Sequence, residues 1–207
     1  MNKLTKIFVK DNVFESDVLE EIKQEIKQRK DDFIFNNQNP DYTKWRIYEA
    51  NQKIAGYVWS SLFNSMVVRK FKEIDDFAFH SISYTNIHTT SITSHINGKP
   101  CGWHKNDMIA IPDRINSLNY VIHIDLGNKF TGGNLELSYD NIPEISEGWY
   151  PEREPTVHET VEYKDNRMVI FPTHLWHKVQ TINTGNKEIT SPLDGRLTIN
   201  GHIGWRL

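Results

Sequence analysis

The sequence predicts a mostly β protein with flanking helices, built as a sandwich or a barrel. The main observation is a series of short segments, from about residue 77 onward, that are rich in Ile, Val, Thr and aromatic residues. Gly, Asn, Asp and Pro separate them, as expected for strands joined by turns. The segments read FAFHSISYTNI, SITSHI, LNYVIHIDL, NLELS, RMVIFP, HKVQTI and RLTINGHIGW. Seven strands in succession favour two packed sheets or a closed sheet.

The second observation is a pair of amphipathic helical segments in the first third of the chain. After a short strand in IFVKDNVF, the stretch SDVLEEIKQEIKQRK predicts a helix, with Ser16 as its N-cap and Asp17 in its first turn. A second helix is predicted over about residues 51–63. The apolar positions of the first helix form one narrow stripe, Val18, Leu19, Ile22 and Ile26. We therefore expect both helices to cover a sheet.

We expect one domain over residues 1–207, with residues 1–76 as helical and strand support and residues 77–207 as the core. The segment YDNIPEISEGWYPEREPTVHET, residues 139–160, interrupts the strands with three prolines and five glutamates. It is either a lid over a site or an excursion of the surface.

Composition excludes several classes of protein. The net charge of −3 over 207 residues gives no basic excess for nucleic acid. The single cysteine, Cys101, cannot form an internal disulfide, which favours a reducing compartment. The N-terminus has no apolar run of a signal peptide, and no stretch of 18 apolar residues predicts a membrane span. We expect a cytoplasmic protein that contacts neither nucleic acid nor membrane, whose oligomeric state the sequence leaves open.

Two of the nine histidines stand out by context. His104 ends the stretch HINGKPCGWH, and His177 closes FPTHLWH, 73 residues later. Imidazoles bind Fe, Zn, Cu and Ni, although two distant histidines are weak evidence alone. In GRLTINGHIGW, Arg196 and Thr198 are two apart on one predicted strand, so their side chains share a face. A guanidinium beside a hydroxyl is well suited to bind a small carboxylate. The alternative is that Arg196 and Thr198 lie on the exposed face of an edge strand and bind nothing.

The order of five motifs resembles a known enzyme family. GWH, GGNLEL, VIFPTHLWHKV, GRLT and a final GW follow one another over about residues 80–207, and KIFVKDNVFESDVLEEIKQEI is similar to the usual lead-in. The chain resembles the Fe(II)- and 2-oxoglutarate-dependent dioxygenases, in particular their prolyl-4-hydroxylase-like branch. The resemblance implies a double-stranded β-helix, which is a cupin-like jelly roll, with supporting helices.

The resemblance assigns the metal histidines. The first maps onto His104. The second maps onto His177 rather than His174, because the family places it five residues after the proline of FP and two before a valine. Pro172 and Val179 satisfy both spacings.

The resemblance also implies the co-substrate residues and the chemistry. Arg196 with Thr198 would bind the far carboxylate of 2-oxoglutarate, and Tyr120 is a further candidate contact. The cofactors implied are Fe(II), 2-oxoglutarate and O₂, and the reaction is hydroxylation of a prolyl residue, another side chain or a small molecule, with release of succinate. Three tryptophans beside these residues would wall the pocket or pack in the core: Trp103, Trp176 and Trp205.

The chain departs from the family at the third metal ligand. The family has His-x-Asp, and this register gives His104 and Asn106, with Asp107 one residue late. Strand alternation favours Asn106, because residues i and i+2 share a face. Charge favours Asp107, because an anion holds a divalent metal better than an amide does, and one bulge at Lys105–Asn106 would turn it inward. We expect Asp107 to be the ligand, with Asn106 as the alternative.

Three other functions fit parts of the pattern. A non-catalytic jelly-roll binding module with a degenerate metal site would explain Asn106, although the retained Arg196 argues against it. A related non-haem iron halogenase would lack the acid, but Asn106 would crowd the halide position. A zinc hydrolase using His174 and His177 lacks a nearby glutamate base.

Overall fold

The computed structural model describes residues 7–36, 44–64, 90–96, 102–106, 114–145, 150–185 and 189–206, with the backbone alone for 114–117 and 204–206. In chain order its elements are β1 (Phe8–Asp11), α1 (Ser16–Gln28), η1 (Lys30–Asp32), β2 (Ile34–Asn36), β3 (Lys44–Ile47), α2 (Gln52–Leu62), β4 (Ser91–His95), β5 (Arg114–Ile124), β6 (Thr131–Gly132), β7 (Leu135–Ser138), β8 (Glu159–Val161), β9 (Arg167–Pro172), β10 (Trp176–Val179), β11 (Ile182–Asn183), η4 (Pro192–Asp194) and β12 (Arg196–Arg206). None of the helices in the described segments is long and apolar enough to cross a membrane.

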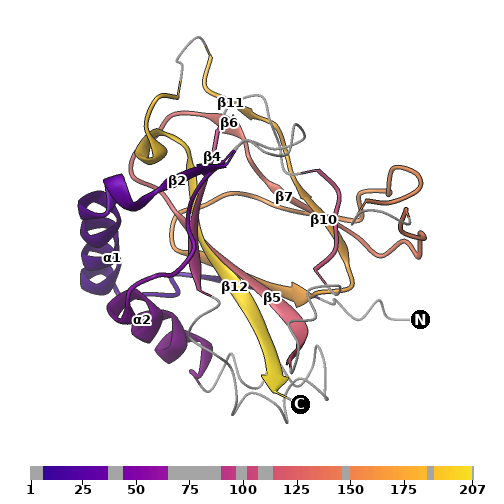
Figure 1. Ribbon diagram of the computed structural model, residues 1–207, viewed down its shortest axis with the longest axis horizontal. Helices are drawn as coiled ribbons and strands as arrows, with labels where there is room; N and C mark the ends of the chain where they lie inside the picture. The colour runs from indigo at the N-terminus through magenta and orange to yellow at the C-terminus, as the bar shows by residue number, and fades with distance from the viewer. Residues whose placement is uncertain are drawn as a thin grey trace.

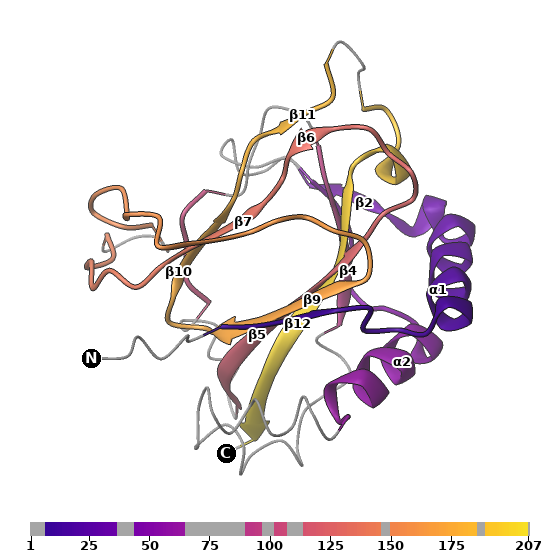
Figure 2. The ribbon, with the colours of Figure 1, turned by 180° about the vertical axis from the view of Figure 1, so that it is seen from behind.

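Two sheets make up most of the fold. The larger has seven strands in the order β1-β9-β5-β12-β4-β3-β2, and the smaller has three in the order β10-β7-β8. Every pairing in both sheets is antiparallel. Figures 1 and 2 show both helices on one side of the larger sheet and the strands β7 and β10 on its other side. The predicted mostly β fold with flanking helices is confirmed.

The N-terminal third contributes strands as well as helices. β1 lies at one edge of the large sheet, while β2 and β3 form the other edge, so residues 1–76 do more than support a separate core. The strand predicted in FAFHSISYTNI lies outside the described residues. Strands from both sides of residue 76 therefore belong to one sheet, and the sheet has no boundary at that position.

The two helices cover the large sheet with apolar side chains. α1 buries its stripe of Leu19, Ile22 and Ile26. The predicted N-cap at Ser16 is wrong: the helix already includes Ser16, because the extended backbone ends at Glu15, which makes no side-chain cap bond. α2 begins after Asn51, whose side-chain oxygen accepts the Ile54 N–H at 2.9 Å.

The large sheet has two different faces. On the helix side, alternate residues of β5 join the apolar core: Leu118, Tyr120, Ile122 and Ile124. The side chains that alternate with these along β5 point to the opposite side, toward the small sheet: Asn119, Val121 and His123. β12 repeats the division, since Leu197 and Ile199 lie in the core.

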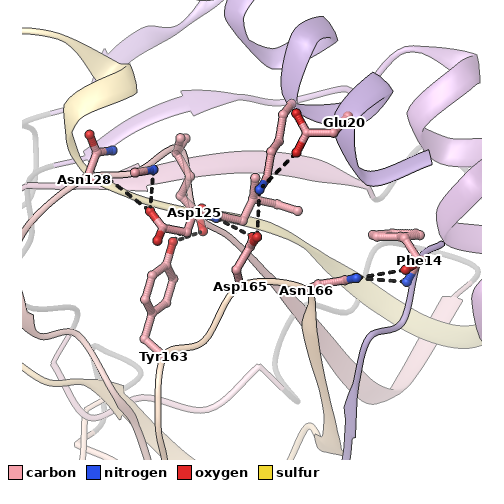
Figure 3. A network of polar contacts seen from close by, with 11 residues as sticks. Phe14, Glu20, Asp125, Asn128, Tyr163, Asp165 and Asn166 are labelled. Carbon is pink, nitrogen blue, oxygen red and sulfur yellow. Dashed lines mark hydrogen bonds and ion pairs between the residues drawn. The ribbon is translucent and has the colours of Figure 1, made fainter. Parts of the chain in front are cut away.

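Polar contacts of the turn before β9 tie the N-terminal segment to the sheet (Figure 3). The Asp165 carboxylate accepts from Lys23 Nζ of α1 at 2.7 Å and from the Asp125 N–H at 2.8 Å. Asn166 accepts the Phe14 N–H at 2.9 Å and donates to the Phe14 carbonyl at 2.8 Å. These bonds hold α1 against the end of β5.

Candidate functional site

His104 and His177 lie directly opposite each other. Each backbone N–H donates to the other residue's carbonyl at 3.0 Å, which makes a two-residue antiparallel bridge. Directly paired residues of antiparallel strands project to the same side. The two imidazole rings accordingly lie 4.1 Å apart between centroids. Residues 73 positions apart in the sequence thus present two adjacent imidazoles.

The hydrogen bonds of both rings fix the tautomer that a metal requires. His104 Nδ1 lies 2.8 Å from the Gly102 carbonyl, and His177 Nδ1 lies 3.0 Å from the Leu175 carbonyl. A carbonyl only accepts, so the proton of each neutral ring is on Nδ1 and the lone pair is on Nε2. Burial, and then the neighbouring His104, hold the pKa of His177 well below its usual range, so this ring is neutral. Such carbonyl partners are typical of metal-binding histidines.

The structure brings His177, and not His174, to this position. His174 is exposed, whereas His177 is buried and its ring meets the edge of Phe171 at 4.9 Å. The HxxH pair of the zinc-hydrolase alternative therefore does not face one point.

Asn106 lies beside the two histidines. Its backbone N–H donates to the Thr173 carbonyl at 3.1 Å, two residues beyond the Leu175 that the bridge register would place opposite it. Its side-chain Nδ2 lies 3.2 Å from His177 Nε2 and donates to Asn119 Oδ1 at 3.1 Å. Asp107 lies outside the described residues, so its prediction as the third ligand stays a prediction. Within the described segments, no three His, Cys, Asp or Glu side chains come together as a metal site.

Arg196 is held at the start of β12 on the same side of the sheet. It is 1% exposed, and its Nε donates to the Gly133 carbonyl at 2.5 Å. Its guanidinium carbon lies 5.1 Å from the centre of the Tyr163 ring. Gly133 has a φ of +74°, and a Cβ there would lie 3.0 Å from the Arg196 side chain. The second glycine of GGNLEL thus makes room for the arginine.

A histidine that the sequence analysis did not select faces this guanidinium. His123 Nε2 lies 3.4 Å from Arg196 Nη2, and His123 Nδ1 accepts the Lys164 N–H at 3.2 Å. Burial and then Arg196 hold the pKa of His123 well below its usual range, so the ring is neutral and its single proton is on Nε2. Two N–H donors therefore lie side by side, and an anion placed to one side of the pair would accept from both.

Arg196 and Thr198 share the inner face, with two further polar residues beside them. Across β4, Arg196 is paired with His95 and Thr198 with Thr93. His95 is 6% exposed, and its buried Nδ1 has no hydrogen-bond partner among the residues that the structure describes. Thr198 Oγ1 accepts from Asn200 Nδ2 at 3.2 Å. The inner face of β4, β5 and β12 is therefore a polar surface next to the paired imidazoles.

Tyr120 is not brought to this surface. It lies in the core under the helices, and its hydroxyl bonds Thr90 Oγ1 at 2.7 Å. The residues of β5 on the inner face are Asn119 and His123. The sequence contained this signal, because Tyr120 has the parity of Leu118, Ile122 and Ile124.

The outer face of the histidine bridge carries two of the predicted pocket tryptophans. Trp103 and Trp176 form a buried cluster with Ile142, so they pack behind the bridge and do not wall the ring side. The side chain of Trp205 lies outside the described part. Ile142 belongs to the insertion 139–160, whose described part thus lies behind the site. Of the two alternatives for this insertion, the placement of Ile142 favours the surface excursion over the lid.

Comparison with known proteins rests on structure alone, because no sequence-family profile and no curated protein matches the chain. A prolyl-4-hydroxylase from Pseudomonas putida superposes with a TM-score of 0.61 at 13% identity, covering 97% of this chain and 92% of the hydroxylase. An oxidoreductase of the 2OG-Fe(II) oxygenase family from Burkholderia pseudomallei gives 0.58 at 13%, covering 98% and 86%. The non-haem α-ketoglutarate-dependent epimerase SnoN of nogalamycin biosynthesis gives 0.65 at 10%, covering 97% and 76%.

The chain has the fold of these oxygenases. The structural likeness confirms the predicted jelly roll and a resemblance in fold to prolyl-4-hydroxylase-like oxygenases. At 10–13% identity it does not carry over a substrate or a reaction, and the similar structures themselves include both a hydroxylase and an epimerase.

Proposed function

We propose that the chain is an Fe(II)- and 2-oxoglutarate-dependent oxygenase. The observation that carries the proposal is the pair His104 and His177, whose Nδ1 atoms lie 2.8 and 3.0 Å from backbone carbonyls, leaving both lone pairs on Nε2. A structural pair of buried histidines has no need of matching tautomers or of adjacent rings. The fold and the arginine at the start of β12 point to the same chemistry.

The residues present fit a divalent iron. His104 and His177 would supply two imidazole ligands, and both are oriented by second hydrogen bonds, as metal-binding histidines usually are. Two nitrogen ligands with an oxygen ligand on one side leave positions for 2-oxoglutarate and O₂. When bound, this group supplies oxygen activation with decarboxylation of 2-oxoglutarate to succinate, which amino-acid side chains cannot provide.

For the third ligand, the placement of Asn106 supports the alternative to Asp107. Its amide lies 3.2 Å from His177 Nε2, where an oxygen ligand would have to stand. Rotating the amide by 180° would present Oδ1 in place of Nδ2. If Asn106 is the ligand, Asn106→Asp adds an anion and should tighten metal binding at least about tenfold, or about 1.4 kcal/mol.

The variants Asn106→Ala and Asp107→Ala separate the two assignments. The one that removes the ligand should abolish Fe(II) binding, and the other should leave it intact. Retained binding in both variants would place the third ligand elsewhere in the chain.

The far carboxylate of 2-oxoglutarate would lie beside Arg196 and His123. Arg196 supplies charge, while His123 supplies a second N–H at 3.4 Å from the guanidinium. Thr198, on the same face, would supply the hydroxyl. Since all three groups are buried, a carboxylate there is shielded from water, and its charge-assisted bonds gain strength.

The reaction that we propose is hydroxylation of a prolyl residue, another side chain or a small molecule in the cytoplasm. A halogenase is disfavoured because the Asn106 amide stands 3.2 Å from His177 Nε2, in the position that a halide would need. A non-catalytic module would explain a neutral third residue, but it gives no role to the adjacent donors of Arg196 and His123.

The direct experiment is anaerobic addition of Fe(II) and 2-oxoglutarate to the purified protein. We expect the weak visible charge-transfer band of the iron chelate, followed by succinate formation when O₂ is admitted. The variants His104→Ala and His177→Ala are the controls and should give neither signal. Absence of both the band and succinate in the unmodified chain would overturn the oxygenase proposal in favour of a binding module.

A further inference from the structure

The histidine bridge carries a second arrangement on its outer side. His104 pairs with His177 in an antiparallel bridge, and on either side of this bridge Lys105 contacts Trp176 and Lys178 contacts Trp103. Alternation directs these four side chains away from the imidazole rings. They form two lysine–tryptophan pairs, one on each side of the bridge, and the lysine of each pair lies on a different strand.

In each pair the ammonium lies over the indole of the facing strand. Lys105 Nζ is 4.4 Å from the centre of the Trp176 ring, and Lys178 Nζ is 4.7 Å from that of Trp103. The tryptophans are 0% and 7% exposed, so both cation–π contacts are largely desolvated and therefore strong for their kind. The lysine side chains are only 15% and 23% exposed.

The insertion closes this arrangement from behind. Ile142 packs against both tryptophans. Glu144 lies 3.6 Å from Lys105 Nζ, and Glu154 lies 3.5 Å from Lys178 Nζ. Each lysine thus has an indole on one side and a carboxylate of the insertion on another. Lys178 has an additional partner on β7, Glu136, at 3.1 Å.

Lys105 is the member that bears most directly on the metal site. It stands between His104 and Asn106 in the chain, so its position determines where both backbone segments lie. Metal sites require ligands held within about 0.5 Å and 10–20° of their working geometry. Its contacts with Trp176 and Glu144 lock that short segment against the strand that carries His177.

We propose that Lys105, held by Trp176 and by Glu144 of the insertion, is a positioning residue that sets the metal affinity of the two-histidine site. The inference rests on the proposed function, since it assumes that these histidines bind a metal. It gives the insertion a defined task, which is to brace the bridge from its outer side.

The test is a titration of the metal-free protein with Co(II), followed by its ligand-field absorption. Lys105→Met keeps the aliphatic length and removes the charge. We expect it to weaken Co(II) binding about tenfold or more, as for partners that orient metal ligands. Glu144→Gln should weaken it less, and Lys105→Arg, which keeps a cation over the indole, should restore affinity to within about threefold of the unmodified protein.

The matched control is Lys53→Met on α2, which removes a lysine 3.1 Å from Glu21 and away from the bridge. Thermal unfolding of the metal-free variants should show little loss for Lys53→Met and a moderate loss for Lys105→Met, and Co(II) affinity should fall only in the latter. Unchanged affinity in both Lys105→Met and Glu144→Gln would overturn this assignment while leaving the proposed function intact. Failure of the unmodified protein to bind Co(II) would overturn both.

Discussion

The two faces of β5 and β12 differ in what their side chains do, although they alternate along the same strands. Toward the helices, Ile122 and Ile199 are fully buried among other apolar side chains. Toward the small sheet, His123 and Arg196 are equally buried but polar. Burying such groups costs free energy that their hydrogen bonds must first offset, so we expect the inner face to contribute less to stability than the apolar face toward the helices. The polar face therefore indicates a binding site.

The largest effect on the inner face is expected from removing a histidine of the bridge. His104→Ala or His177→Ala should weaken Fe(II) binding by more than about a hundredfold, because orienting partners alone contribute 10–100-fold. The metal-free protein should keep its fold. Equilibrium dialysis with Fe(II) or Mn(II) measures the loss, and circular dichroism checks the fold. Unaltered metal binding would show that the inner face serves another ligand.

The opposite face is tested by Ile122→Ala. Deleting a fully buried isoleucine should lower the free energy of unfolding by about 2–5 kcal/mol. The folded fraction should still bind Fe(II) and 2-oxoglutarate with unchanged dissociation constants. Urea unfolding and binding titrations measure the two quantities. A large change in affinity would mean that the two faces are not independent.

The pH dependence of stability also distinguishes the two faces, because, among the described residues, only the inner face carries buried histidines that can take up a proton. Burial, then Arg46 and His104, lower the pKa of His202 to about 4. The unfolded chain, with a pKa of about 6.5, binds the proton first, so stability present above pH 6.5 is lost as the pH falls toward 4. His202 alone should contribute about 3 kcal/mol of this loss in the metal-free protein, at about 1.4 kcal/mol per pKa unit.

The control for this titration is His202→Gln, which should make the loss between pH 6.5 and 4 smaller by about 3 kcal/mol, while the other buried histidines keep their share. Urea unfolding at several pH values measures it. An equally steep loss in the variant would assign the dependence to other buried histidines of the inner face, such as His95, whose pKa burial and Arg196 also lower.

The smallest effect is expected for the carboxylate subsite. Arg196→Ala should raise the dissociation constant of 2-oxoglutarate at least about tenfold, since a charge-assisted bond contributes about 1.5–3 kcal/mol. Fe(II) affinity should change little. Isothermal titration of the metal-loaded protein measures both. Normal 2-oxoglutarate binding by the variant would refute the assignment of Arg196.

Much of this candidate site was open to prediction from the sequence, and the misplacement of Tyr120 is instructive. The resemblance selected His177 over His174, and the structure exposes His174 and buries His177. Period-two alternation placed Arg196 and Thr198 on one face. The same rule, applied to LNYVIHIDL, would have assigned Tyr120 to the apolar face and Asn119 and His123 to the polar one. The resemblance suggested that the Tyr120 hydroxyl lies at the site, but the alternation of side chains along β5 places Tyr120 in the apolar core.

The insertion shows what sequence reasoning does not reach. Its prolines and charges marked residues 139–160 as lying outside the core, which is compatible with a lid or with a brace. Only the register of the bridge sets Trp103 and Trp176 on its outer side, and only the packing of Ile142 against them determines where the described part of the insertion lies.

The sequence by itself predicted both helices and most of the strands in the second half of the chain, because local periodicity encodes them, and its resemblance to the oxygenases selected His104 and His177 as candidate ligands. Tertiary structure decided the rest. The adjacent donors of Arg196 and His123, 3.4 Å apart, join residues 73 positions distant in the chain. The contact of Asn106 with His177 depends on where one short segment pairs with β10. Such contacts arise from how strands far apart in the sequence align, and no local pattern specifies that alignment.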